Sequence, residues 1–132
     1  MSLDKIKIIK LKIIKNSSGD LLKYLDKNSK YFKKFGETYF TEIKKNKVKG
    51  WNYHKKFYSL ITVPYGKVKF TFAQDITKRK KIIIVGKKSY SLILVPPGLW
   101  FKFESLVKLS LVVNTLNNIH KTNETLKIPI NV

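Results

Sequence analysis

Hydrophobic and polar residues alternate along several stretches that follow Gly36. Lys67 to Phe72 (KVKFTF) is the most regular of these stretches, and Leu106 to Val113 (LVKLSLVV) repeats its pattern. Because the side chains of a strand point alternately to the two faces of a sheet, this period of two predicts strands that are buried on one face. Segments rich in β-branched and aromatic residues predict further strands, at Thr38 to Ile43, Trp51 to Val63, Lys81 to Val85 and Ser91 to Val95.

Turn signals separate these strands at short intervals. Pro64-Tyr65-Gly66 is expected to turn the chain, and Gly86-Lys87-Lys88 predicts a tight hairpin between its two flanking strands. Helical periodicity is scarce, so about seven or eight short strands are expected. The chain is therefore predicted to be all-β, as a sandwich or a small barrel.

The two ends of the chain carry weaker patterns. Lys5 to Lys15 (KIKIIKLKIIK) alternates Lys with Ile or Leu but slips once, which favours an edge strand with a bulge. A basic amphipathic membrane helix is the alternative, but the apolar positions do not hold the helical period that it needs. Asn16 to Asp20 is a predicted turn, and Ile119 to Val132 is a predicted loop with a final short strand.

Length and composition narrow the class of protein. A chain of 132 residues with 43% hydrophobic residues can bury one core, which predicts a single domain over residues 1–132. The absence of cysteine excludes disulfides and thiolate chemistry. No apolar run is long enough to cross a bilayer, so we expect no membrane contact and a cytoplasmic location.

The charge of the chain raises the question of a nucleic-acid partner. Lysine and arginine total 28 against 8 acidic residues, a formal net charge of +20, which makes a basic nucleic-acid-binding β-barrel one hypothesis. Only Arg79 is an arginine, however, and base and phosphate recognition favour the bidentate guanidinium group. The sequence is also rich in Ile and Asn, as an AT-rich coding sequence would give. Nucleic acid is therefore the less favoured partner.

Two segments resemble the motifs of a known family. Lys49 to Gly66 (KGWNYHKKFYSLITVPYG) contains a glycine, an Asn-x-His pair and a second glycine, and Val95 to Phe103 (VPPGLWFKF) contains Pro-Pro-Gly followed by aromatic residues. This pair resembles the two motifs of the cupins. The resemblance is greatest to the RmlC-like and WxcM-like members, the 3,5-epimerases and 3,4-ketoisomerases of dTDP-4-keto-6-deoxy sugars. Gly19-Asp20-Leu21 and Asn123-Glu124 look similar to that family as well. The resemblance implies a cupin-like double-stranded β-helix, or jelly roll, with its barrel at about residues 36–115.

Two positions depart from the family pattern. Asn52 stands where the first motif has its first histidine, and Phe101 where the second motif has its histidine. A divalent metal needs three or four converging ligands, and only His54 and Asn52 remain at the expected positions. The resemblance also implies enzymes that work without a metal, so we predict no metal and no cofactor. The opposing tyrosine of the epimerases would fall near Asn117 or Asn118, neither of which is an acid.

The residues that remain suit proton transfer beside a ketone. Such a reaction needs a base with a pKa near neutrality and a donor for the developing enolate oxygen. His54 fits the first role, and Asn52 is expected on the same face of its strand as a donor. Tyr39 is a candidate auxiliary acid or orienting hydroxyl. One histidine can move a proton along one face of a sugar ring, so these residues favour a ketoisomerase over an epimerase, which needs a second acid.

Five further residues are candidate substrate-binding groups: Lys49, Trp51, Lys55, Trp100 and Phe101. Lys49 stands where the resemblance places a diphosphate-binding arginine, and lysine can act there only as a point charge. Aromatic residues can stack on a nucleobase, although core packing is their commoner role. His120 lies in a polar stretch and is expected at the surface.

Together these observations predict an isomerase or epimerase that acts on a nucleotide-diphosphate sugar in surface-polysaccharide biosynthesis. The resemblance also implies a homodimer in which the strand at residues 5–15 is exchanged between subunits. Two other functions stay open. Asn52 and Phe101 also fit a cupin that binds a nucleotide sugar without turnover, and charge alone supports the nucleic-acid-binding barrel.

Overall fold

The computed structural model describes residues 2–119 and 124–130. Strands dominate this part of the chain, which also contains two short 3-10 helices. The elements are η1 (Ser2–Lys5), β1 (Lys7–Lys10), β2 (Ile13–Ile14), β3 (Leu21–Leu22), β4 (Glu37–Lys44), β5 (Val48–His54), β6 (Ser59–Tyr65), β7 (Lys67–Ala73), β8 (Lys80–Gly86), η2 (Lys87–Ser89), β9 (Ser91–Val95), β10 (Trp100–Ser105), β11 (Leu109–Leu116) and β12 (Thr125–Lys127).

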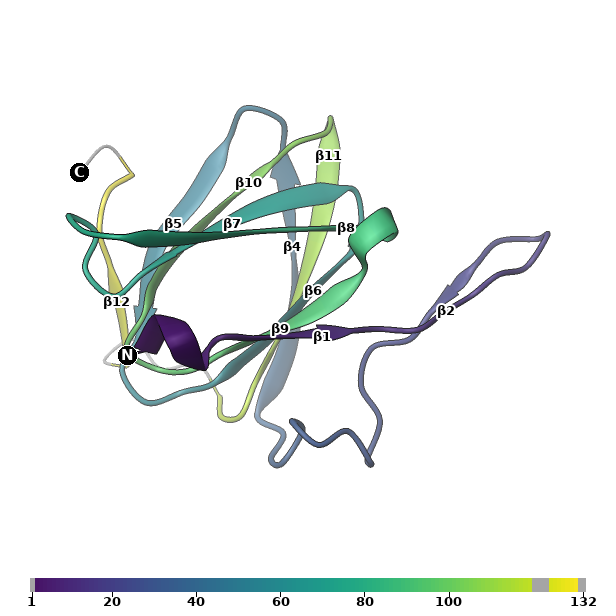
Figure 1. The fold of residues 1–132 in the computed structure, drawn as a ribbon, viewed down its shortest axis with the longest axis horizontal. Coiled ribbons are helices and arrows are strands. Elements are labelled where there is room, and N and C mark those ends of the chain that lie inside the picture. Colours follow the sequence, from purple (N-terminus) through teal and green to yellow (C-terminus); the bar gives the residue numbers. More distant parts are fainter. Residues whose placement is uncertain (1, 120–123, 131–132) are drawn as a thin grey trace.

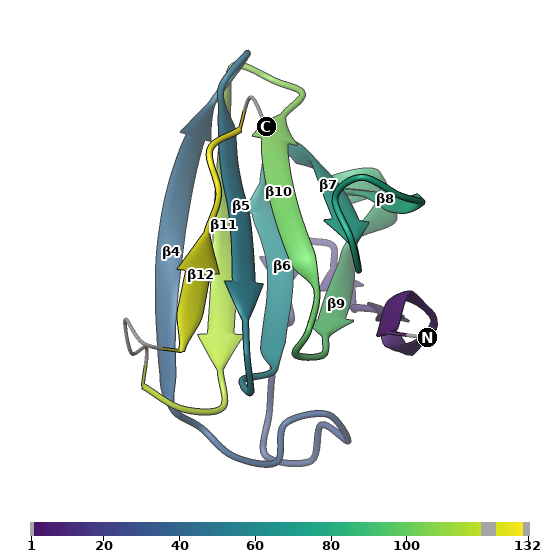
Figure 2. The ribbon, with the colours of Figure 1, turned by 90° about the vertical axis from the view of Figure 1, so that its left-hand side faces the viewer.

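The described strands form two five-stranded antiparallel sheets, which face each other across the buried core. One sheet has the strand order β1-β9-β6-β11-β4, and the other has the order β12-β5-β10-β7-β8. In Figure 2, strands β12, β5 and β10 lie in front of β4, β11 and β6. The prediction of an all-β chain is confirmed. Within the described residues, no helix has the length and apolar character to span a membrane.

The facing sides of the two sheets bury the hydrophobic core. Val68, Phe70 and Phe72, the apolar face predicted for β7, are fully buried. Ile61 and Ile93 pack into the same cluster from the opposite sheet. Burying a large apolar side chain stabilises a fold by about 1.5–3 kcal/mol. The alternation in the sequence therefore translates directly into the layer that holds the two sheets together.

The chain crosses from one sheet to the other where a hairpin was expected. Strand β8 pairs with β7, whereas β9 pairs with β1 and β6, so the hairpin predicted at Gly86-Lys87-Lys88 is wrong. Helix η2 carries the chain between the sheets instead. Gly66 makes a similar crossing after β6, with a φ of 90°. A Cβ atom there would lie 2.7 Å from the carbonyl oxygen of Leu109, so the crossing needs glycine.

The segment predicted as one strand from Trp51 to Val63 forms two. Strand β5 ends at His54, and β6 begins at Ser59 in the other sheet. Between them, the backbone N–H groups of Lys56 and Phe57 donate to the carboxylate of Glu124. These donors are therefore not available to a β-ladder, which is the physical reason for the break.

The N-terminal segment forms an edge strand and then a projecting arm. Strand β1 pairs with β9 at the edge of its sheet, as an edge strand was predicted. Strands β2 and β3 form a hairpin that extends away from the two sheets in Figure 1. Asp20 ties this arm to η2, because its carboxylate lies 2.9 Å from Lys87 Nζ and 3.1 Å from Lys15 Nζ. The Lys87 hydrogen bond, followed by those of Asn16 and Lys15, lowers the pKa of Asp20 well below its usual value.

Candidate active site

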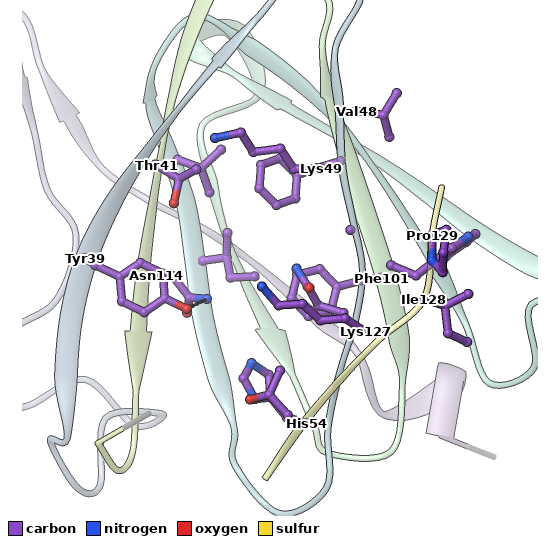
Figure 3. Close-up of a pocket in the computed structure, with 17 residues that line it drawn as sticks. Tyr39, Thr41, Val48, Lys49, His54, Phe101, Asn114, Lys127, Ile128 and Pro129 are labelled. Carbon is purple, nitrogen blue, oxygen red and sulfur yellow. Dashed lines mark hydrogen bonds between the residues drawn. The ribbon is translucent and has the colours of Figure 1, made fainter. Parts of the chain in front are cut away.

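A cavity of about 610 Å³ opens between the two sheets and is drawn in Figure 3. Tyr39 and Asn114 line it from β4 and β11 of one sheet. Asn52 and His54 line it from β5 of the other sheet. The three residues proposed from the sequence for proton transfer thus lie around one cavity, and they reach it from two opposite walls.

His54 is held in a buried position on the β5 wall. Only 6% of the residue is exposed, and its Nδ1 atom lies 2.8 Å from Oε1 of Glu124. The rings of Phe57 and Phe101 each lie 6.3 Å from the imidazole, centroid to centroid, in a stacked orientation. These contacts leave the imidazole one orientation in the wall of the cavity.

Glu124 is the group that orients the imidazole. Its Oε2 atom accepts hydrogen bonds from the backbone N–H groups of Lys56 at 2.8 Å and Phe57 at 3.0 Å. Burial by itself raises the pKa of this carboxyl, but the hydrogen bonds from Lys56, His54 and Phe57 outweigh it and lower the pKa below 4.5. Glu124 is therefore an ionised acceptor, so Nδ1 of His54 is the donor. In the neutral ring the basic lone pair then lies on Nε2.

The two sequence motifs are adjacent in space, and each supports the other. The N–H group of Gly98, in the Pro-Pro-Gly turn, donates to the carbonyl of His54 at 2.9 Å. Strand β10 pairs with β5, so that Phe101 stands opposite Asn52. Gly50 allows this close approach, because it has a φ of 117° and a Cβ there would lie 2.6 Å from the carbonyl oxygen of Phe101. The glycines of both motifs therefore place the Asn52 and His54 side chains.

The opposite wall carries a second polar pair. Nδ2 of Asn114 donates to the hydroxyl oxygen of Tyr39 at 3.2 Å. Desolvation, followed by the charge of Glu37, raises the pKa of Tyr39, while the Asn114 hydrogen bond acts in the opposite direction. Tyr39 is consequently a protonated phenol at neutral pH. Its hydroxyl is suited to donating a hydrogen bond at this wall.

Cations line the rim of the cavity. Lys49 on β5 and Lys127 on β12 both contribute to the lining. Among the lining residues in the described part of the chain, none is acidic. Since two lysines face a cavity without a lining carboxylate, the electrostatic field there favours an anionic ligand.

The remaining candidates from the sequence divide into two groups. Phe101 and Trp51 line the cavity, and the Trp51 ring also packs 5.0 Å from Lys102 Nζ. Lys55 is exposed, and neither it nor Trp100 belongs to the cavity lining. Trp100 packs instead against Tyr53, with 4.8 Å between the ring centroids. His120 lies outside the described residues.

Three functional candidates were missed from the sequence: Asn114, Glu124 and Lys127. Glu124 had a signal in the Asn123-Glu124 pair, but nothing local connects it with a histidine 70 positions earlier. Asn114 interrupts an apolar run on β11, which is a visible signal. As for metals, the described residues contain no group of three or more His, Asp or Glu side chains placed to hold one.

The two facing sheets and the cavity between them define a cupin-type jelly roll, as the sequence predicted. The chain belongs to the family described as "FdtA: WxcM-like, C-terminal", whose model matches residues 4–127. Both the fold and the family expected from the two motifs are therefore confirmed. A comparison with curated proteins gave no match.

Solved structures with the same fold include sugar-nucleotide enzymes. A dTDP sugar isomerase from Desulfovibrio desulfuricans G20 is 26% identical, with a TM-score of 0.89 over 96% of this chain and 85% of that chain. QdtA, a sugar 3,4-ketoisomerase from Thermoanaerobacterium thermosaccharolyticum in complex with TDP, is 21% identical, with a TM-score of 0.79 over 94% and 88%. The 3,5-epimerase RmlC from Legionella pneumophila Philadelphia 1, in complex with dTDP-4-keto-L-rhamnose, is 16% identical, with a TM-score of 0.82 over 98% and 76%.

Proposed function

We propose that the protein is a metal-independent isomerase of nucleotide-linked keto sugars, specifically a 3,4-ketoisomerase of a dTDP-4-keto-6-deoxyhexose. The observation that carries the proposal is the buried His54, whose Nδ1 atom is fixed by an ionised Glu124 in the wall of a polar cavity. Membership of the WxcM-like family and the likeness to a dTDP sugar isomerase support the substrate class. The positions of the side chains around the cavity support the roles that we propose for the individual residues.

The reaction requires one proton to move between neighbouring carbons. Nε2 of His54 removes the proton from C3, the C3–H electron pair forms a C3–C4 double bond, and the ketone at C4 becomes an enolate oxygen. Asn52 and Tyr39 are the groups that donate hydrogen bonds to this oxygen. The hydroxyl proton at O3 then passes to O4. As His54 returns its proton to C4, the electron pair on O3 forms the ketone at C3. The product is the 3-keto isomer, and no oxidant or reductant is consumed.

Binding of the nucleotide is assigned to the cationic rim. Lys49 and Lys127 are placed to attract a diphosphate, each as a point charge. Phe101 and Trp51 are buried, and we assign them to the hydrophobic wall beside the sugar. Trp100 and Lys55 are left with no assigned contact to substrate, because they lie outside the cavity lining.

A 3,5-epimerase is the second candidate, and one observation favours it. Tyr39 faces the cavity from the wall opposite His54, which is where a second acid would have to stand to protonate the other face of the ring. The ketoisomerase remains the preferred function, because a single fixed imidazole is sufficient for it.

Incubation with dTDP-4-keto-6-deoxyglucose in deuterated buffer tests the proposal. A ketone that moves to C3 with deuterium at C4 indicates the ketoisomerase, and a ketone that stays at C4 with deuterium at both C3 and C5 indicates the epimerase. Binding without exchange or rearrangement indicates a cupin that has lost turnover. Activity that survives the substitution His54→Gln would overturn the assignment of the base.

Calorimetric titration with dTDP, UDP and a short DNA duplex separates these functions from the nucleic-acid hypothesis. Binding of dTDP alone supports a nucleotide-sugar site. Binding of the duplex alone, with an affinity that falls steeply with salt, would replace the proposal with the basic β-barrel hypothesis.

The proposal includes a homodimer, a cytoplasmic location and a role in surface-polysaccharide biosynthesis. The location rests on the apolar runs of the sequence, none of which is long enough to cross a bilayer, and the role rests on the family resemblance. The dimer has independent support, because Ile14 and Leu21 on the projecting arm are 41% and 51% exposed. Sedimentation equilibrium of the wild type and of the variant Ile14→Lys/Leu21→Lys tests it: a dimer that dissociates in the variant is expected, and a monomeric wild type would exclude it.

A further inference from the structure

Asn114 is an unusual residue for its position in the sheet. It lies on β11 between Val113 and Thr115, and only 6% of it is exposed. Its Oδ1 atom is buried and has no hydrogen-bond partner among the described residues. A buried acceptor without a partner destabilises a fold, whereas an apolar side chain of similar size would not. Folding alone therefore does not account for an asparagine here.

The other end of the same amide makes a directed contact. Nδ2 donates to the hydroxyl oxygen of Tyr39 at 3.2 Å, which uses one acceptor site of that oxygen. The hydroxyl hydrogen of Tyr39 is then directed away from Asn114. Tyr39 lines the cavity and lies on the wall that faces His54, as Figure 3 shows.

We propose that Asn114 is a positioning residue, which holds the Tyr39 hydroxyl as a hydrogen-bond donor toward the ketone oxygen of the bound sugar. The proposal rests on the proposed function and adds a residue and a direction to it. Asn114 acts only through Tyr39 and makes no contact with the reacting carbons. The unpaired amide oxygen of Asn114 lowers the stability of the fold. The benefit is catalytic, because the Tyr39 hydroxyl is already oriented as a donor when the ketone binds.

A double-mutant cycle tests this role, with Asn114→Leu, Tyr39→Phe and the combined variant. The rate of deuterium incorporation at the sugar carbons is measured with dTDP-4-keto-6-deoxyglucose, together with the melting temperature of each protein. We expect Tyr39→Phe to lower the rate by about 100-fold, as the loss of an oxyanion donor does. Asn114→Leu is expected to lower it by about tenfold, and the combined variant should be no slower than Tyr39→Phe alone.

The melting temperature separates positioning from a merely structural role. If Asn114 only positions Tyr39, Asn114→Leu keeps or raises the melting temperature while the rate falls, because the unpaired acceptor is removed. A lower melting temperature with an unchanged rate would overturn the proposal. Effects of the two substitutions that multiply in the combined variant would also overturn it. Should Asn114→Leu fail to fold, the isosteric Asn114→Asp replaces it, and a rate as low as that of Tyr39→Phe is expected because an acceptor-only carboxylate draws the Tyr39 hydrogen to itself.

A binding measurement distinguishes failure of this inference from failure of the proposed function. In a protein that binds but does not turn over, the affinity for dTDP-4-keto-6-deoxyglucose relative to dTDP replaces the rate. Tyr39→Phe and Asn114→Leu should lower this ratio while the affinity for dTDP stays the same. An unchanged ratio overturns the inference alone, whereas a wild-type protein that binds neither compound overturns the proposed function and this inference together.

Discussion

The two walls of the cavity satisfy their polar groups to different degrees. On the β5 wall, each carboxylate oxygen of Glu124 has a donor, from His54 on one side and from the Lys56 and Phe57 backbone on the other. On the β4 and β11 wall, Tyr39 and Asn114 share one hydrogen bond and leave the amide oxygen of Asn114 buried without a partner among the described residues. The hydrogen bonds of the first wall hold a base in one orientation. The second wall contains a polar pair with an unsatisfied acceptor, which the stability of the fold alone does not explain.

The largest expected effect comes from removing the base of the first wall. His54→Gln keeps a side chain of similar length but cannot take a proton at neutral pH, so the exchange rate should fall by about 10²–10⁴-fold. Deuterium incorporation followed by NMR checks this, with circular dichroism to confirm the fold. A rate within a few-fold of wild type would contradict the assignment of the base.

Glu124→Gln tests the orientation of the imidazole and not its presence. The amide can donate to Nδ1, which would move the ring proton to Nε2 and lower the rate by about 100-fold. A His54→Gln/Glu124→Gln protein should be no slower than His54→Gln alone. Equal rates for Glu124→Gln and wild type would mean that the orientation of the His54 imidazole does not depend on the Glu124 carboxylate.

The same substitution predicts a pH-dependent difference in stability. Because the pKa of Glu124 is lowered in the folded state from 4.5, the ionised carboxylate stabilises the fold above that pH. Wild type should therefore be more stable than Glu124→Gln by about 1–3 kcal/mol at pH 7. This difference should shrink as the pH falls below the usual pKa of a glutamate carboxyl. Urea unfolding at a series of pH values measures it. A difference that grows in acid would have the wrong sign.

Gly50→Ala should disturb the first wall through the backbone. Its φ of 117° and the 2.6 Å approach of a Cβ to the Phe101 carbonyl predict a loss of more than about 1 kcal/mol in the free energy of unfolding. Gly19→Ala is the matched control, since its φ is also positive, at 128°, but nothing lies within 4 Å of its Cβ position. Equal losses for the two variants would show that the backbone conformation, and not the approach of β10, sets the effect.

The smallest effect is expected at the rim, where Lys49 and Lys127 both belong to the sheet that contains β5. Lys49→Ala and Lys127→Ala should each weaken binding of dTDP by about two- to fivefold at low salt, because exposed charge pairs are weak. The loss should diminish as salt increases. Titrations at two salt concentrations measure it, with Lys55→Ala as the control outside the cavity. A larger loss for Lys55→Ala would move the phosphate site away from the cavity.

Local pattern predicted much of the fold, because period two is a property of neighbouring residues. The apolar face of β7 follows directly from it. On β11 the pattern at Leu106 to Val113 is misleading, because the strand begins at Leu109, which is 36% exposed, and Ser110 is fully buried. The hairpin predicted at Gly86 is wrong for a reason that local signals do not contain. Strand β9 pairs with β6 and with β1, the latter more than 80 residues away, and η2 turns the chain toward them. Sheet membership depends on such distant pairings.

The same difference between local patterns and distant contacts applies to the candidate site. His54 and Asn52 share a strand and a motif, so their common direction could be predicted. The same rule places Trp100 and Phe101 on opposite faces of β10, and only Phe101 reaches the cavity. Glu124 and Asn114 meet their partners across 70 and 75 positions, through sheet packing that no local pattern indicates.

The short strand β12 carries Lys127 in the lining of the pocket, and Glu124, the residue before it, is the hydrogen-bond partner of His54. A stop codon just after β11 would spare both sheets except for one edge strand and still remove the partner of His54. Such a truncated product should keep the circular dichroism of a folded β-protein and be inactive in an assay.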